Sequence, residues 1–259
     1  MKKIAYVIVL LIILTGCQQK ITTYKEVIED GKVEIDGISY DIKFSAKASL
    51  NYDNNGNLIE SVGFIDDSEM RTEYSYQNNQ LIEERRYVDD EVTFSINHYY
   101  KNKQLSKTLT RSYSDKYNEG VEERISEYTY GELTRTEINK DSNGNILGTK
   151  TTHLDESDKI LGYIFTNPKG EIVVTSTCYY ENDELIKVVR NGDGVYNTTM
   201  NYEYNNIGDV IVEYAIYHGE KSNLMAVFYE YEYNEKLLPK TRTVYRIQAP
   251  IDEENIRDY

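Results

Sequence analysis

Several residue types are rare in this 259-residue chain, and their scarcity excludes whole classes of stabilisation and chemistry. Tryptophan is absent, and only two cysteines and three prolines are present. Two cysteines allow one disulfide at most, so a disulfide framework is excluded. Basic residues number 29 against 44 acidic ones, for a net charge of −15. Because such a surface repels phosphate groups, nucleic acid is not an expected partner.

Recognisable catalytic and cofactor motifs are also missing. The three histidines, His98, His153 and His218, lie far apart and form no His-x-x-x-His metal spacing. His98 alternates with apolar residues, which favours a packed strand histidine. The sequence contains no Gly-x-Ser-x-Gly nucleophile elbow and no phosphate-binding glycine loop. It therefore predicts no catalytic site, no metal site and no cofactor, and an enzyme is the third choice among function classes.

The N-terminus carries an export signal. It begins with the basic pair Lys2-Lys3, continues with an apolar run over residues 4–14 and ends at small residues. The run is about 11 residues long, whereas about 20 are needed to span a bilayer, so we interpret it as a removable signal. Leu14-Thr15-Gly16-Cys17 resembles the bacterial lipobox, in which the cysteine receives diacylglycerol before cleavage.

The lipobox resemblance implies that residues 1–16 are the signal peptide and that Cys17 is the lipid-bearing first residue of the mature chain. Acyl chains on Cys17 would anchor the protein to the cell membrane, facing outside the cytoplasm, at the outer surface or in the periplasm. Residues 17–30 are then the tether, residues 31–247 a β-repeat domain and residues 248–259 an acidic tail. The alternative is a secreted protein in which the cysteine occurs by chance.

With Cys17 committed to lipid, Cys178 has no intramolecular disulfide partner. It lies in the alternating pattern of residues 174–180, which favours a small buried strand residue over a reactive thiol.

The aromatic residues are almost all tyrosine, with 26 Tyr against 5 Phe. Tyrosine combines an apolar ring with a hydroxyl that needs water or a partner, so it suits a sheet whose faces are only partly buried. From Ile38 to Tyr52, apolar and polar residues alternate strictly. This period of two predicts an antiparallel strand with one buried face and one wet face.

Strand and turn patterns then recur along the chain. In residues 51–59, Asp53-Asn54-Asn55-Gly56 supplies a tight turn and Leu58 restarts the alternation. The first apolar residue after each such turn recurs every ~12 to 14 residues, or at about twice that interval. No segment shows convincing helical periodicity, although residues 23–29 are ambiguous. We therefore expect an all-β fold, an antiparallel meander of about 16 short strands in Tyr-rich repeats, as a curled single sheet that is barrel-like or folded over.

The unit resembles the YD or Rhs-type repeat, whose core is Tyr-x-Tyr-Asp-x-x-Gly-Asn/Arg-Leu. Residues 51–59 are the nearest copy and residues 202–210 the next, whereas other copies lack the aspartate or the glycine. In large Rhs proteins such repeats build a β-hairpin shell around a toxin. This chain is too short for such a shell, so the resemblance implies β-hairpins and, for function, carbohydrate or cell-surface binding.

Tyr-x-Tyr pairs near strand ends are the candidate ligand-binding aromatic face, because each pair places two rings on one face of a strand. The candidates are Tyr74, Tyr76, Tyr128, Tyr130, Tyr202, Tyr204, Tyr231 and Tyr233. Stacking of these rings between neighbouring strands would stabilise the sheet, by roughly 0.2–1 kcal/mol a pair. Rings on a concave surface would instead stack on sugars or hold a protein partner.

Acidic turns are the other recurrent feature. Residues 53–57 and 141–145 resemble calcium loops superficially, but their glycine is fourth and no glutamate stands at position twelve. We interpret them as turns, with weak surface calcium binding as the alternative.

These features predict a lipid-anchored cell-envelope protein with a non-enzymatic binding or structural role toward a carbohydrate or protein ligand. The alternative is an immunity or interaction lipoprotein that neutralises a basic toxin through its acidic surface.

Overall fold

The computed structural model describes residues 25–28, 32–35, 38–42, 44–65, 68–113, 121–193, 196–218 and 223–250. Cys17 and the tail after Pro250 therefore lie outside the described residues. Contacts divide the chain into two units, residues 1–42 and 43–259. Every regular element within the described ranges is a β-strand.

A search of the described residues for a helix long and apolar enough to cross a membrane finds none.

The first unit contains a three-stranded antiparallel sheet in the order β1-β2-β3. Its strands are β1 (Lys25–Ile28), β2 (Lys32–Ile35) and β3 (Ile38–Asp41). The β1 strand shows that part of the ambiguous segment 23–29 is extended.

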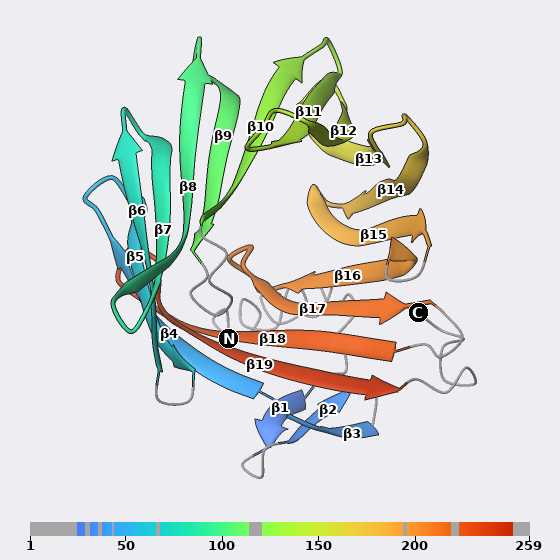
Figure 1. The fold of residues 1–259 in the computed structure, drawn as a ribbon. Helices are drawn as coiled ribbons and strands as arrows, with labels where there is room; N and C mark the ends of the chain where they lie inside the picture. The colour runs from blue at the N-terminus through green and yellow to red at the C-terminus, as the bar shows by residue number, and fades with distance from the viewer. Residues whose placement is uncertain are drawn as a thin grey trace, which may run out of the picture. The chain divides into compact units, whose positions relative to one another are not determined.

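The second unit is a closed barrel of antiparallel strands that follow one another in sequence order (Figure 1). The strands are β4 (Phe44–Tyr52), β5 (Leu58–Ile65), β6 (Ser68–Gln77), β7 (Gln80–Val88), β8 (Glu91–Lys101), β9 (Gln104–Tyr113), β10 (Val121–Tyr130), β11 (Thr134–Asp141), β12 (Ile146–Leu154), β13 (Ile160–Thr166), β14 (Ile172–Glu181), β15 (Glu184–Gly192), β16 (Thr198–Tyr204), β17 (Val210–Tyr217), β18 (Asn223–Tyr233) and β19 (Pro239–Pro250). The last strand pairs with the first, and Thr241 on β19 lies opposite Ser49 on β4. The expected all-β antiparallel meander is confirmed, and its barrel-like form is a closed barrel of 16 strands.

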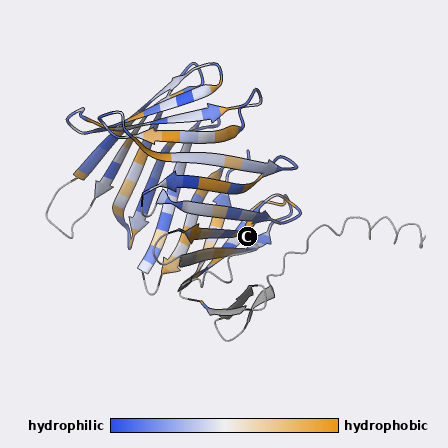
Figure 2. Ribbon diagram, turned by 90° about the vertical axis from the view of Figure 1, so that its right-hand side faces the viewer, coloured by the Kyte–Doolittle hydropathy of each residue, from blue (hydrophilic) through white to orange (hydrophobic). Residues whose placement is uncertain are grey.

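The alternating run from Ile38 to Tyr52 is divided between β3 and β4, which belong to different sheets, so the prediction of one strand was wrong in length. Within β4 the alternation follows the predicted pattern. Ser45, Lys47 and Ser49 are exposed, whereas Leu50, on the opposite face, is buried. Hydrophilic and hydrophobic residues are interspersed along the barrel strands in the same way (Figure 2).

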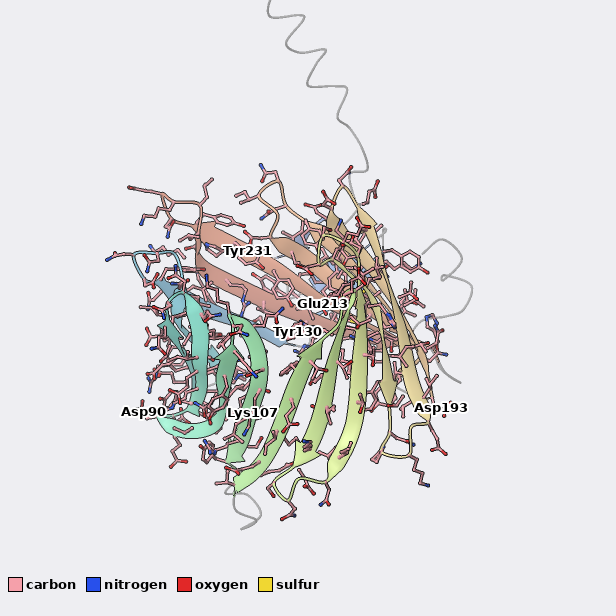
Figure 3. The ribbon with its side chains drawn as sticks, turned by 90° about the horizontal axis from the view of Figure 1, so that it is seen from above. Asp90, Lys107, Tyr130, Asp193, Glu213 and Tyr231 are labelled. Atoms are coloured by element: carbon pink, nitrogen blue, oxygen red, sulfur yellow. The ribbon has the colours of Figure 1, made fainter. Side chains whose placement is uncertain are left out.

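The register tells which residues share a barrel face, and the view along the barrel shows which face is inner (Figure 3). Arg242 on β19 and Tyr74 on β6 occupy the same face of the sheet, three strand steps apart in the order β19-β4-β5-β6. Burial raises the pKa of Tyr74, and the positive charge of Arg242 acts in the opposite direction. Because neighbouring strands are ~4.8 Å apart, side chains this many strands apart interact most readily across the barrel interior. Seen from above, Tyr130, Glu213 and Tyr231 of this face lie on the inner side of the ring of strands (Figure 3).

Two turn types close the hairpins, and each follows from its residues. Four two-residue turns have positive φ at both positions, as type I′ turns require, and these turns are rich in Asn and Asp. They are Asn78-Asn79, Asp89-Asp90, Asn102-Lys103 and Asn182-Asp183.

The second turn type repeats six times with one hydrogen-bond pattern. Its first residue is Asp or Asn, and the side-chain oxygen accepts from the backbone N–H groups two and four positions later. These first residues are Asp53, Asp141, Asp155, Asn167, Asn205 and Asn234. The residue three positions on has positive φ, which is why glycine stands there in four copies, as in Gly56 and Gly208. The interpretation of residues 53–57 and 141–145 as turns agrees with this geometry.

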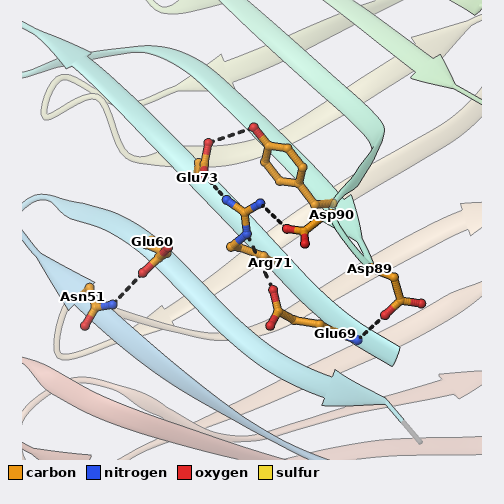
Figure 4. Close-up of polar contacts among 8 residues, drawn as sticks. Asn51, Glu60, Glu69, Arg71, Glu73, Asp89 and Asp90 are labelled. Carbon is orange, nitrogen blue, oxygen red and sulfur yellow. Dashed lines mark hydrogen bonds and ion pairs between the residues drawn. The ribbon is translucent and has the colours of Figure 1, made fainter. Parts of the chain in front are cut away.

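The outer face carries ion pairs in its first half. Arg71 on β6 bonds Glu73 on its own strand and Asp90 in the turn after β7 (Figure 4). Farther round, Arg111 on β9 pairs with Glu123 on β10 at 2.6 Å. Partly exposed pairs of this kind stabilise a fold by about 0–1 kcal/mol each.

The deepest apolar packing is at the other end of the sequence. Ala226, Phe228 and Ile247 are almost completely buried, at 0–2% exposure, and Val212 and Ile216 are nearly so. All five lie on outer-face positions of β17, β18 and β19.

Candidate functional site

All eight candidate tyrosines lie on the inner face of the barrel. They come as pairs from β6, β10, β16 and β18. None of these strands is a direct neighbour of another in the barrel order. The structure therefore spreads the pairs around the barrel interior, and it differs in this respect from the expected stacking between neighbouring strands.

The ring contacts instead run along one strand. On β18 the rings of Tyr229 and Tyr231 lie 6.4 Å apart and nearly parallel, and those of Tyr231 and Tyr233 lie 5.9 Å apart. Residues two apart on a strand share a face, so three consecutive Tyr-x-Tyr positions form a column. This column is a strip of aromatic surface on the inner wall.

Many of the hydroxyls hold the barrel together. Five inner tyrosines each donate a hydrogen bond to the backbone carbonyl of the preceding strand's first or second residue. The pairs are Tyr100 to Leu81, Tyr130 to Leu105, Tyr180 to Ile160, Tyr204 to Leu185 and Tyr231 to Val210, with distances of 2.8–3.0 Å.

These carbonyls need a partner because the backbone ladder stops short of them. The β7–β8 ladder begins at Glu83 opposite Asn97, two residues beyond Leu81. The Leu81 carbonyl lies beyond the end of this ladder and accepts a hydrogen bond from the Tyr100 hydroxyl. A buried or half-buried carbonyl without a partner costs free energy, so the tyrosine hydroxyl substitutes for the missing ladder bond.

Tyr233 serves a turn instead of a ladder end. Its hydroxyl donates to the Asp209 carboxylate at 2.8 Å and accepts from the Asn205 side-chain amide at 2.6 Å. Both partners belong to the turn between β16 and β17. The last ring of the column is thereby fixed against the barrel rim.

Burial changes the ionisation of these phenols. It raises the pKa of Tyr202 to about 12 and that of Tyr231 to about 12. Both hydroxyls are therefore protonated hydrogen-bond donors over the physiological pH range.

In the described strands, three inner-face cations lie near inner rings: Arg86 near Phe94, Lys150 near Tyr163, and Arg242. Arg242 lies opposite Tyr231 in the β18–β19 ladder, and its guanidinium carbon is 6.0 Å from the centre of the Tyr229 ring. Its positive charge also acts on Tyr52 of β4 and Tyr74 of β6. Its Nε is buried without a hydrogen-bond partner, and the described residues include no carboxylate paired with it.

The remaining sequence candidates do not converge on a site. His98 lies on β8, His153 on β12 and His218 after β17. Burial lowers the pKa of His98. The Nε2 atom of His218 lies 2.9 Å from the Thr199 hydroxyl. In the described ranges, no group of three or more His, Cys, Asp or Glu residues is placed to hold a metal.

Cys178 lies half-buried on the inner face of β14, and burial raises the pKa of its thiol. A raised pKa lowers the thiolate fraction, which agrees with the interpretation of an unreactive strand residue.

Sequence reasoning missed Tyr52, Tyr100, Tyr180, Tyr229 and Arg242 as members of the inner surface. For two of them, Tyr100 and Tyr180, the sequence did contain a signal. Each ladder-end tyrosine stands 19–25 residues after the apolar residue whose carbonyl it binds. Arg242 gave no such signal, because its neighbours in space come from both ends of the barrel sequence.

Comparisons with known proteins give two findings. Residues 1–18 match the family described as a prokaryotic membrane lipoprotein lipid attachment site. Among solved structures, the chain is similar to a porin-like protein from Bacteroides uniformis, with 13% sequence identity and a TM-score of 0.41 over 80% of this chain and 96% of that one. No curated protein matches the chain. The attachment site identifies a lipid-anchored envelope protein.

Proposed function

We propose that this lipid-anchored envelope protein is a non-enzymatic binding protein whose inner barrel face takes a carbohydrate ligand. The observation that carries the proposal is the Tyr229-Tyr231-Tyr233 column on the inner wall. Its rings offer flat apolar surface, and tyrosine hydroxyls add hydrogen-bonding groups beside it, which is the combination that sugar rings require.

The outer face supports a barrel that stays in water beside the membrane. On the outer face, Arg111 of β9 and Lys140 near the end of β11 pair with the carboxylates of Glu123 and Glu127 on β10. A basic residue facing lipid at the bilayer centre costs about 2–4 kcal/mol. In this proposal the lipid on Cys17 supplies the membrane attachment, and the barrel supplies the binding surface.

The hairpins support the proposed kinship with YD-type repeats. The six Asx turns share one hydrogen-bond pattern, and the Asp53 and Asn205 copies are those nearest to the YD core motif. We propose that these hairpins are degenerate members of that repeat class, with a structural role in the barrel.

A glycan array probed with the full-length, detergent-extracted protein tests the carbohydrate proposal. Specific glycan binding that falls when Tyr229→Ala is introduced supports it. The matched control is Tyr99→Ala, because Tyr99 is an exposed tyrosine on the outer face. Absence of binding to every glycan class would overturn the proposal.

A second candidate is an immunity or interaction lipoprotein that binds a basic protein. The observation in its favour is the charge distribution, because the chain is strongly acidic while the inner face carries many basic residues. Acidic residues such as Asp89, Asp90 and Asp183 stand exposed at turns. Deletion of the gene without any gain of sensitivity to neighbouring cells would exclude this role.

A further inference from the structure

The inner face differs in charge from the rest of the molecule. Within the barrel strands its basic residues outnumber its acidic ones. The basic residues are Arg86, Arg124, Arg135, Lys150, Arg190, Arg242 and Arg246, and the acidic residues are Glu84, Glu122, Glu137, Asp141 and Glu213. In a chain of net charge −15, this segregation points to an anionic ligand inside the barrel.

Several of these charges are already compensated. Arg86 pairs with Glu84 and Arg124 with Glu122, at 2.7 Å in each case. Each of these pairs has almost no net charge, so it would attract an anionic ligand only weakly. Cations without a carboxylate partner are therefore the informative ones.

Arg242 combines an aromatic ring 6.0 Å from its guanidinium carbon with a buried Nε that has no hydrogen-bond partner. The Arg242 cluster, defined as Tyr52, Tyr74, Tyr229, Tyr231 and Arg242, draws side chains from β4, β6, β18 and β19. The guanidinium approaches the Tyr229 ring, lies beside Tyr231 in the ladder and acts electrostatically on the other two phenols. A single charged group thus lies near the Tyr229 ring and shares one barrel face with tyrosines from both ends of the barrel sequence.

The acidic groups near this cluster are engaged elsewhere. Asp209 accepts from the Tyr233 hydroxyl, and Glu213 accepts from the Tyr229 hydroxyl at 3.4 Å. The buried Nε of Arg242 has no hydrogen-bond partner at all. An unpaired donor on a half-enclosed charged group is unfavourable, and no carboxylate of the described residues pairs with this guanidinium, so an anion brought to it forms a charge-assisted pair in partly buried surroundings.

We propose that the Arg242 cluster binds a sugar that carries a carboxylate, with the guanidinium paired to the carboxylate and the tyrosine rings against the sugar ring. The inference rests on the proposed carbohydrate function and narrows it to acidic oligosaccharides. A planar guanidinium matches a carboxylate with two parallel hydrogen bonds, which a lysine ammonium does not.

Titration calorimetry of the full-length, detergent-extracted protein with two probes tests this subsite. The acidic probe is an oligogalacturonate, and the neutral probe is a galacto-oligosaccharide of the same length. We expect the acidic probe to bind more tightly and to lose affinity as salt is added. Arg242→Gln should weaken its binding at least about tenfold, since charge-assisted hydrogen bonds are lost, and leave the neutral probe unaffected.

Two further variants keep the result interpretable. Arg85→Gln removes a matched arginine from the outer face and should leave binding unchanged, because Arg85 is exposed and pairs with Glu83. Arg242→Lys keeps the positive charge but loses the planar guanidinium that makes two parallel hydrogen bonds. Its affinity for the acidic probe should therefore lie between those of wild type and Arg242→Gln. A cooperative thermal unfolding transition shows that a variant is folded. If Arg242→Gln is unfolded, the comparison of Arg242→Lys with wild type provides the test.

The outcomes separate the two proposals. Equal binding of both probes with no effect of either Arg242 variant would overturn the acidic-sugar subsite and leave carbohydrate binding standing. Binding of neither probe, together with a silent glycan array, would overturn both.

Discussion

The Tyr231 hydroxyl donates a hydrogen bond of 3.0 Å to the backbone carbonyl of Val210, at the point where the ladder between β17 and β18 has ended. Four other tyrosines make the same bond on other strand pairs. Tyrosine is therefore a structural element of this repeat, in addition to any contact its ring makes with a ligand.

Removal of this hydroxyl should destabilise the barrel. For Tyr231→Phe we expect the free energy of unfolding to fall by about 0.5–1.5 kcal/mol, because the Val210 carbonyl loses its partner. Urea denaturation measures the change. Tyr99→Phe is the control, since Tyr99 is exposed on the outer face, and it should change the stability little. Equal effects of the two substitutions would show that the ladder-end bond contributes nothing.

The turn between β18 and β19 contains a strained residue. Leu237 has φ 58, whereas four of the equivalent turn positions carry glycine. Leu237→Gly should raise the free energy of unfolding, by about 1 kcal/mol, because a leucine in the left-handed region is strained. The reciprocal change, Gly208→Ala, should lower it by a similar amount. No atom lies within 4 Å of the position of the added Cβ at Gly208, so the backbone conformation alone is tested.

Acid should weaken the turns that begin with aspartate. The Asn57 side chain, with backbone amides of the turn, lowers the pKa of Asp53. A lowered pKa stabilises the fold above the unfolded value, near 4, and this contribution is lost as the pH falls through the lower folded value.

Asp53→Asn should therefore reduce the loss of stability on acidification, as followed by the urea midpoint against pH. Asparagine occupies the same position at Asn167 and accepts the same backbone hydrogen bonds there. Asp158→Asn is the control, because Asp158 lies in an equivalent turn at the positive-φ position instead of the first. An identical acid profile for Asp53→Asn and wild type would contradict this account.

Alkaline pH should destabilise the barrel, because it ionises tyrosines that are half-buried on the inner face. Burial raises the pKa of Tyr202 and Tyr231 to about 12, above the ordinary value of 10.0. Because the unfolded chain releases these protons first, the stabilisation is complete below about pH 10 and is lost as the pH rises through about 12. Tyrosinate absorbance and circular dichroism, recorded together, should show late ionisation of these phenols with loss of strand structure. Full tyrosine ionisation near pH 10 with the barrel intact would contradict the raised values.

Cys17 is the predicted lipid attachment point, within the residues that match the lipoprotein attachment-site family. In Cys17→Ser we expect the protein to leave the membrane fraction, because the acyl chains have no attachment point. Cell fractionation and immunoblotting measure the shift. Cys178→Ser is the matched control and should remain with the membrane, since Cys178 lies within β14. Membrane retention of Cys17→Ser equal to that of the parent would exclude the anchor.

The sequence by itself determined the local structure. Alternation predicted the two unlike faces of β4, although not the division of the run from Ile38 into β3 and β4, and Asn, Asp and Gly at defined positions predicted the tight turns. These features depend on residues close together in the chain, so their physical causes, side-chain period and allowed φ angles, are visible in a short stretch. The strand number and the meander order followed from the same local signals.

Only the tertiary structure decided that the sheet closes and which face lies inside. Pairing of β19 with β4 joins residues almost two hundred positions apart, such as Thr241 and Ser49. Alternation separates two faces but does not tell which is concave, because closure depends on twist and stagger summed over the whole sheet. The electrostatic interaction of Arg242 with Tyr74 depends on that closure. No local sequence pattern could therefore predict the candidate site.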